Sequence, residues 1–214
     1  MTAETEQRTE ARKIGEVGGL GDIYQVALPL DKQIVAFHQA GIKHPYLVTP
    51  EETVRVRLAG VSDDYTRTSM TPIAVKGART ILTKVPLLMN PIFAKMAIDA
   101  HRKGEYLTLP RQIYEASEAI ANSETGIEPE DRTAISLSQQ GDYSLIPEMD
   151  ETRFSLGRKA KEYFERFGHK TIPFWNLSAE NKKDAIVNYL WFYGPRGGSC
   201  LGCRDRVLGI HGRA

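Results

Sequence analysis

Two cysteines near the C-terminus have the spacing of a metal-binding or redox pair. Cys200 and Cys203 form a Cys-x-x-Cys motif inside a glycine-rich segment. Two thiolates at this spacing can bind one soft metal ion such as zinc, because the turn between them lets both sulfurs point to one centre. The chain has no other cysteine. A four-ligand zinc site would therefore need histidines, with His211 as the nearest candidate, or a second copy of the chain.

The same pair could instead cycle between a dithiol and a disulfide. Nearby cations lower the pKa of a thiol and favour the reactive thiolate, and Arg196, Arg204 and Arg206 flank the motif. The strand before the pair and the long helix after it, which accompany thioredoxin-like motifs, are missing from the pattern. A third interpretation, which the single motif favours, is that both cysteines are small buried apolar side chains.

The basic and aromatic C-terminal third of the chain, residues 151–214, is a second candidate for function. It contains 12 Lys and Arg against 6 Asp and Glu, and 10 of the 18 aromatic residues. Aromatic rings and arginines are enriched in protein interfaces, whereas cations beside rings also suit nucleic acids. The surface predicted to contact a protein partner or nucleic acid comprises Arg158, Lys159, Lys161, Lys182, Lys183, Trp191, Tyr193, Arg196, Arg204 and Arg206.

The absence of known catalytic motifs from the sequence favours a protein that is not an enzyme. The sequence contains no phosphate-binding loop, no dinucleotide fingerprint and no His-Glu-x-x-His motif. Ser199 has Leu201 where the second glycine of a nucleophile elbow should stand. The five histidines are scattered, and a single histidine is more often structural than a general base.

Hydrophobic periodicity predicts a mainly helical chain with a minor β component. Capping residues, prolines and apolar stripes predict helices at about 31–40, 91–103, 111–121, 151–167 and 178–193. Residues 49–58 combine a helix start with the alternation of a strand, and we favour the helix. Residues 24–30 and 46–48 are predicted to form a short N-terminal strand pair.

Charge divides the chain into unlike segments, although its formal net charge is only +1. We expect a polar tail at 1–13 and a mixed, mainly helical domain at 14–150. Residues 151–214 are expected to form a basic, aromatic pair of helices followed by a Gly/Arg-rich tail. This last segment is either a second region or part of the same domain. Residues 105–150 hold 10 acidic against 2 basic residues. Their loop at 124–150 is expected to be solvated or to dock on the basic third.

These observations predict a cytoplasmic interaction or assembly subunit. With 41% apolar and 26% charged residues the composition is that of a globular protein, and no apolar run is long enough for a membrane span. The polar N-terminal residues lack the apolar core of a secretory signal. We expect a protein partner or a homo-oligomer, held through the C-terminal third, with a thiol or metal protein and a nucleic-acid-binding protein as the alternatives.

Overall fold

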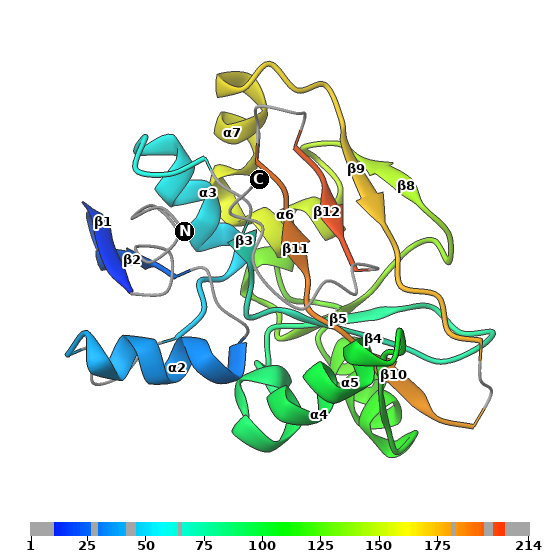
Figure 1. Cartoon of the computed structure of the whole chain (residues 1–214). Coiled ribbons are helices and arrows are strands. Elements are labelled where there is room, and N and C mark those ends of the chain that lie inside the picture. Colours follow the sequence, from blue (N-terminus) through cyan, green and yellow to red (C-terminus); the bar gives the residue numbers. More distant parts are fainter. Residues whose placement is uncertain are drawn as a thin grey trace.

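The computed structural model describes residues 11–26, 30–41, 46–63, 66–180, 183–194 and 199–203. Three sheets organise these residues (Figure 1). A two-stranded sheet pairs β1 (Arg12–Val17) with β2 (Gly21–Gln25), and two five-stranded sheets contain the remaining strands. The prediction of a mainly helical chain is therefore wrong, because the structure is a mixed α/β fold built on these sheets.

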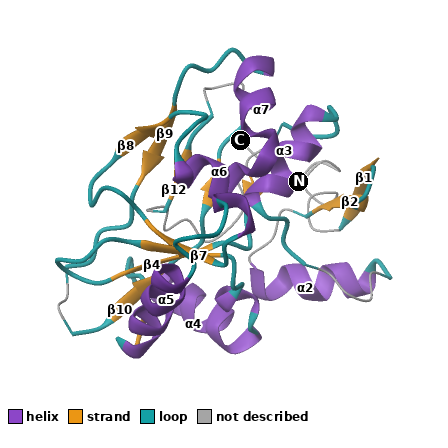
Figure 2. Ribbon diagram, turned by 180° about the vertical axis from the view of Figure 1, so that it is seen from behind, coloured by secondary structure: helices purple, strands orange, loops and turns teal. Residues whose placement is uncertain are grey.

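The first large sheet has the order β6-β10-β4-β5-β7, and all its strand pairs are antiparallel. Its apolar side chains pack with helices α4 (Pro91–Arg102) and α5 (Gln112–Ser123) in one core, and both views place these helices on the same side of the sheet (Figures 1 and 2). The strands are β4 (Thr71–Ala74), β5 (Ile81–Thr83), β6 (Leu107–Leu109), β7 (Ala134–Ser136) and β10 (Ala185–Val187).

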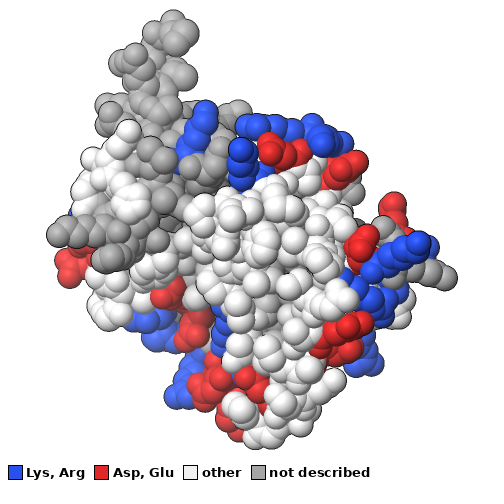
Figure 3. Space-filling model, turned by 90° about the horizontal axis from the view of Figure 1, so that it is seen from below, with Lys and Arg blue, Asp and Glu red and all other residues white. Residues whose placement is uncertain are grey.

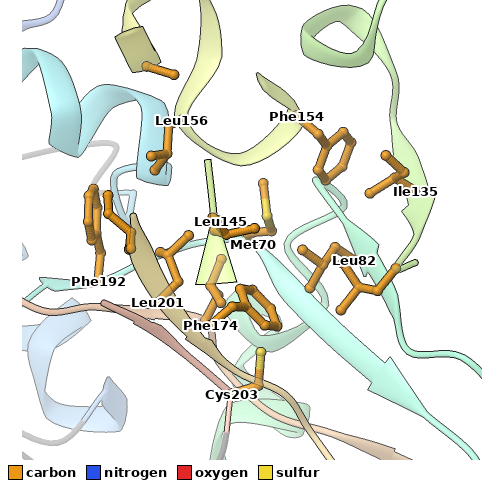
Figure 4. Packing of buried hydrophobic residues seen from close by; sticks show 14 of the residues in the cluster. Met70, Leu82, Ile135, Leu145, Phe154, Leu156, Phe174, Phe192, Leu201 and Cys203 are labelled. Atoms are coloured by element: carbon orange, nitrogen blue, oxygen red, sulfur yellow. The ribbon is translucent and has the colours of Figure 1, made fainter. Parts of the chain in front are cut away.

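The second large sheet has the order β3-β11-β12-β9-β8, with a parallel pair at its centre. Side chains of its inner face meet those of helix α6 (Asp150–Leu156) in a second core, which includes Leu145, Phe174, Phe192 and Leu201 (Figure 4). The strands are β3 (Thr66–Arg67), β8 (Tyr143–Leu145), β9 (Ile172–Trp175), β11 (Trp191–Phe192) and β12 (Leu201–Gly202).

Most of the predicted helices are present. They are α2 (Leu30–Gln39), α3 (Pro50–Leu58), α4 (Pro91–Arg102), α5 (Gln112–Ser123), α6 (Asp150–Leu156) and α7 (Ala160–Arg166), with short 3-10 turns η1 (Leu87–Met89), η2 (Pro129–Asp131) and η3 (Gly157–Lys159). The predicted helix at 151–167 is α6, η3 and α7 in succession. Among these helices none has the length and apolar character needed to cross a membrane.

The prediction of a second C-terminal helix at 178–193 is wrong, because strands β10 and β11 lie in that range. All three residues of β10 are buried, since the strand lies between β4 and β6. A strand buried on both faces shows a continuous apolar run, which periodicity cannot distinguish from a buried helix. Because β10 and β11 pair with strands from 66–109, the ranges 14–150 and 151–214 share both large sheets.

The N-terminal strand pair is also placed differently from the prediction. It consists of β1 and β2 within Arg12–Gln25, and residues 46–48 have no strand. The predicted tail at 1–13 overlaps the start of β1 at Arg12, and residues 1–10 lie outside the described part of the chain.

A capping box fixes the start of α3. The Thr49 hydroxyl accepts a hydrogen bond from the Glu52 amide at 3.0 Å, and the Glu52 carboxylate accepts one from the Thr49 amide at 2.7 Å. These bonds satisfy two backbone donors that a helix start leaves unpaired. Residues 49–58 are therefore a helix despite their alternating valines and arginines.

Replacing Thr49 with alanine is expected to lower the free energy of unfolding by about 1 kcal/mol, because the cap hydroxyl is lost. Urea denaturation measures this change, and Thr49→Ser is the matched control because serine keeps a capping oxygen. A loss of equal size in both variants would contradict the assigned role of the hydroxyl.

Candidate functional site

The two cysteines do not form a joint site. They flank the two-residue strand β12, and an odd spacing in extended chain places their side chains on opposite faces. Cys203 is fully buried in the second core and points toward the ring of Phe174 (Figure 4). Neither cysteine forms a disulfide.

The chemistry of these thiols does not support the predicted metal site. The described residues contain no group of three or more His, Cys, Asp or Glu side chains that could hold a metal ion, and His211 lies outside them. The prediction of a metal-binding Cys-x-x-Cys motif is therefore wrong. Burial raises the pKa of Cys200 to about 11, although the charge of Arg57 opposes this rise. The thiol is protonated at neutral pH, which disfavours redox exchange.

The acidic stretch docks on the basic third through ion pairs. A guanidinium nitrogen of Arg153 lies 2.5 Å from Glu128 and 2.8 Å from Glu130, and Arg158 lies 3.0 Å from Asp131. The described acidic stretch is thus partly neutralised within the chain. Arg158, predicted to meet a partner, already has a carboxylate beside it.

The remaining predicted cations are dispersed. Lys159 at the end of η3 pairs with Glu162 of α7 at 2.8 Å, and Lys161 is exposed on α7. Lys183 is exposed and lines an open pocket of about 590 Å³ beside the start of α5, together with Arg111. Lys182, Arg196, Arg204 and Arg206 lie outside the described residues. The described cations therefore do not gather at one site.

Trp191 is not available to a partner. Its side chain is buried, and the guanidinium carbon of Arg67 lies 4.7 Å from its ring centroid and 4.9 Å from that of Tyr189. This arrangement is a cation–π stack inside the fold. Tyr193, two residues further on, is only partly buried.

The best-formed exposed feature is an aromatic platform, which consists of Trp175 and Tyr193 above Gly202. Along β9, Ile172 and Phe174 are buried while Trp175 is 41% exposed. The Trp175 and Tyr193 ring centroids are 5.3 Å apart at an interplanar angle of 68°, which is an edge-to-face contact. Two rings are therefore held in a fixed relative orientation on the outer face of the second sheet.

Gly202 permits this close packing. It pairs with Trp175 in the parallel register of β12 and β9. A Cβ atom at Gly202 would lie 3.0 Å from Tyr193 Cε2 and 3.3 Å from Trp175 Cε3, closer than ordinary van der Waals contact. Absence of a side chain lets both rings rest on the backbone. Trp175 is not among the residues predicted for the binding surface, although the alternation in Ile172-Pro-Phe-Trp175 is a strand signal that predicts one outward face.

A carboxylate lies next to the platform. The Asn176 amide, which directly follows Trp175, donates to Asp142 Oδ1 at 2.8 Å, and the Asn176 side chain donates to the Gln139 carbonyl at 2.9 Å. These bonds fix the loop before β8 against the end of β9. Asp142 is therefore held beside the residue that follows Trp175.

A polar network lies on the inner side of the same segment. Arg57, which is 3% exposed, donates to the Tyr163 hydroxyl at 2.9 Å and to the Phe192 carbonyl at 2.8 Å. Its guanidinium carbon lies 3.9 Å above the Phe192 ring. The Tyr163 hydroxyl is 2.7 Å from Ser199 Oγ, which in turn is 3.0 Å from His169 Nε2. Helices α3 and α7 are thus linked to the segment that leads into β12.

A second exposed apolar surface lies on α4. Figure 3 views the molecule from below, the side where Figure 1 places α4 and α5, and the centre of this face is largely uncharged. Ile92 is 68% exposed and Met96, one turn later, is 43% exposed. These flexible aliphatic side chains must be ordered when a partner binds, which costs more conformational entropy than binding to two rings on a rigid sheet.

Comparisons with known proteins identify the fold. No protein family model matches the chain, and no curated protein matches it. A solved structure described as "Accommodation of massive sequence variation in Nanoarchaeota by the C-type lectin fold" is similar to it, with a TM-score of 0.54 and 12% sequence identity over 94% of each chain. At this identity the likeness shows the fold alone, which is of the C-type lectin type.

Proposed function

We propose that the chain is a binding protein that docks a protein partner through the aromatic platform. The observation that carries this proposal is the edge-to-face pair of the exposed Trp175 and the partly buried Tyr193, held over Gly202. Tryptophan and tyrosine are enriched among the residues that dominate the energy of protein interfaces. A pair that is already ordered loses little side-chain entropy when a partner binds.

The exposed ring of Trp175 favours a partner with a basic side chain. Aromatic faces attract cations, and tryptophan does so most strongly. A nucleic acid would require cations next to the exposed rings, in order to bind phosphates. Among the described cations of the basic third, Arg153, Arg158 and Lys159 are already in ion pairs, and Lys183 lies beside α5.

Replacing Trp175 with alanine is expected to weaken peptide binding by tenfold or more, about 1.4 kcal/mol, because the main stacking surface is removed. The probe is a random peptide library displayed on phage, selected on the folded chain. We expect the selected peptides to share an arginine or lysine next to an apolar residue. Binding of synthetic copies is then measured by calorimetry.

The matched control is Ile92→Ala, which removes an even more exposed apolar side chain from α4 and should leave peptide binding unchanged. Equal binding by the Trp175→Ala variant would contradict the proposal. Salt-sensitive binding of a single-stranded DNA probe without any peptide selection would instead favour the nucleic-acid alternative. Self-association lost on Trp175→Ala in sedimentation experiments would identify the protein partner as a second copy.

A further inference from the structure

Helix α4 carries apolar side chains on two opposite faces. Ala94 and Ala97 are buried in the core of the first sheet. Ile92 and Met96 are exposed on the other side of the helix, and residues four apart lie above one another on one face. A helix that covers a sheet ordinarily turns polar side chains to the solvent. This second apolar stripe therefore indicates a surface that contacts another molecule.

Helix α5 adds small side chains to the same surface. Ala116 and Ala119 are exposed, and Ile120 is 37% exposed. Both helices cover the same side of the first sheet, and Figure 3, which views this side, shows a broad uncharged centre with side chains of both charges around it. We define the α4–α5 face by the exposed apolar residues of the two helices, which are Ile92, Met96, Ala116, Ala119 and Ile120.

The two helices have opposite net charges. Helix α4 with its C-cap residue has three cations and one acid, a net charge of +2, from Lys95, Arg102, Lys103 and Asp99. Helix α5 with its two cap residues has three acids and one cation, a net charge of −2, from Glu115, Glu118, Glu124 and Arg111. Each helix contains one ion pair, which leaves its surplus charge in place, and these pairs are Asp99 with Arg102 and Arg111 with Glu115.

We propose that the chain forms a two-fold dimer through the α4–α5 face, in which α4 of one copy packs on α5 of the other. A two-fold axis that lies in the plane of the contact and runs between the helices produces this contact twice, once in each direction. The large side chains of Ile92 and Met96 then meet the small side chains of α5, and the positive helix meets the negative one. Packing α4 on α4 would instead place like charges together, which opposes association.

The size of the face predicts a weak, reversible dimer. Each of the two helices has 12 residues. A helix of this length is about 18 Å long and about 10 Å wide, so the pair presents a surface of about 18 by 20 Å. That surface is at the small end of specific protein interfaces, where weak and transient complexes are found. We therefore expect dissociation in the micromolar range.

The proposed dimer goes beyond the binding function assigned to the aromatic platform, and it does not depend on that function. The platform belongs to the second sheet, whereas α4 and α5 cover the first. Each dimer then carries two platforms. A partner with two suitable segments gains avidity from such a dimer, because its second segment binds intramolecularly.

Sedimentation velocity of the full chain over the micromolar range tests the dimer without any ligand. The average mass of the wild type should rise reversibly from monomer toward dimer as the concentration increases. Replacing Ile92 and Met96 together with serine should weaken dimerisation about tenfold or more, because the apolar contact is lost. Ile146→Ser is the matched control and should dimerise as wild type, since Ile146 is 42% exposed and lies after β8, away from both helices in sequence.

Two charge-reversed variants test the pairing of α4 with α5. In the first variant, Lys95→Glu and Lys103→Glu change the net charge of α4 from +2 to −2. In the second variant, Glu115→Lys and Ser123→Lys change that of α5 from −2 to +1. Each variant alone should dimerise more weakly than wild type, because like charges then face each other.

An equal mixture of the two variants should recover association as a heterodimer. The negative α4 of the first variant then lies on the positive α5 of the second, and the other contact is that of the wild type. A mixture that associates no better than its components would overturn the proposed pairing of α4 with α5.

A wild type that stays monomeric throughout the micromolar range would overturn the proposal. Unchanged dimerisation after replacement of Ile92 and Met96 would overturn it as well. Loss of the dimer on Trp175→Ala would place the contact between copies at the platform instead. Because peptide binding is measured separately, failure of the dimer leaves the platform proposal standing, and failure of the platform leaves the dimer testable.

Discussion

Replacing Arg57 with methionine is expected to lower the free energy of unfolding by about 3–5 kcal/mol. Two hydrogen bonds from the buried guanidinium, to the Tyr163 hydroxyl and the Phe192 carbonyl, are lost together. Hydrogen bonds to charged groups contribute roughly 1.5–3 kcal/mol each. Methionine fills part of the volume and keeps the contact with the Phe192 ring, so the loss is mainly that of the donors.

Two of the groups that accept hydrogen bonds from Arg57 are uncharged, which makes this expectation sharper. Apolar replacement of a complete buried ion pair is often harmless, because both charges disappear. Here the oxygens of Tyr163 and Phe192 remain, buried and without the cation that satisfied them.

Urea denaturation of Arg57→Met and Arg55→Met measures the difference. Arg55 lies on the same helix and is partly exposed, and its guanidinium donates to the Gly18 carbonyl at 2.6 Å in an exposed setting. Its removal should cost below about 1 kcal/mol. Similar losses in the two variants would contradict a structural role for the buried guanidinium. The Arg57 variant should also raise the pKa of His169 in an NMR titration, because a nearby positive charge is removed.

The contrast between the two arginines shows what the sequence can and cannot predict. Local signals at Thr49 to Glu52 correctly favour a helix, because capping acts within one turn. Arg55 and Arg57 lie on nearly opposite sides of that helix, but both are arginines, so residue type does not indicate which of them is buried. Burial of Arg57 depends on Tyr163 and Phe192, which are 106 and 135 residues away in sequence. Periodicity carries no information about such distant partners.

The strands were missed for a related reason. Strands β10, β11 and β12 contain three, two and two residues, so none is long enough to display an alternating pattern. Their apolar side chains resemble the stripe of a helix when the chain between Ala185 and Phe192 is considered alone. Pairing with β3, β4 and β6 overrides this local preference.

The candidate site was predicted only in its general region. The composition drew attention to the aromatic residues of 151–214, but it favoured Trp191, which the fold buries under Arg67. Trp175 is exposed because β9 alternates, with Phe174 pointing to the core. The link from Ser199 to His169 and Tyr163 joins positions 30 and 36 residues apart. Only the assembled fold brings these groups together.

Replacing Gly157 with alanine is expected to lower the free energy of unfolding by about 3 kcal/mol or more. Gly157 ends α6 with φ 71° and ψ −166°, a conformation essentially restricted to glycine, where other residues incur about 1–3 kcal/mol of strain. An added Cβ would also overlap the Cγ and Cδ atoms of Glu51 on α3. Thermal or urea unfolding measures the combined effect.

A double-mutant cycle separates the two contributions. Glu51→Ala removes the side chain that meets the new methyl group, so Gly157→Ala should cost less in the Glu51→Ala background, and the difference reports the steric overlap. Gly168→Ala is the control for the backbone alone, because Gly168 has φ 67° and nothing within 4 Å of an added Cβ. It should cost about 1–2 kcal/mol, as left-handed conformations do for other residues. If Gly157→Ala costs no more than Gly168→Ala in the native background, the close approach of α3 to the α6–η3 junction is not a constraint on the fold. A larger loss that Glu51→Ala partly reverses would show that α3, which also carries Arg57, is positioned by this contact.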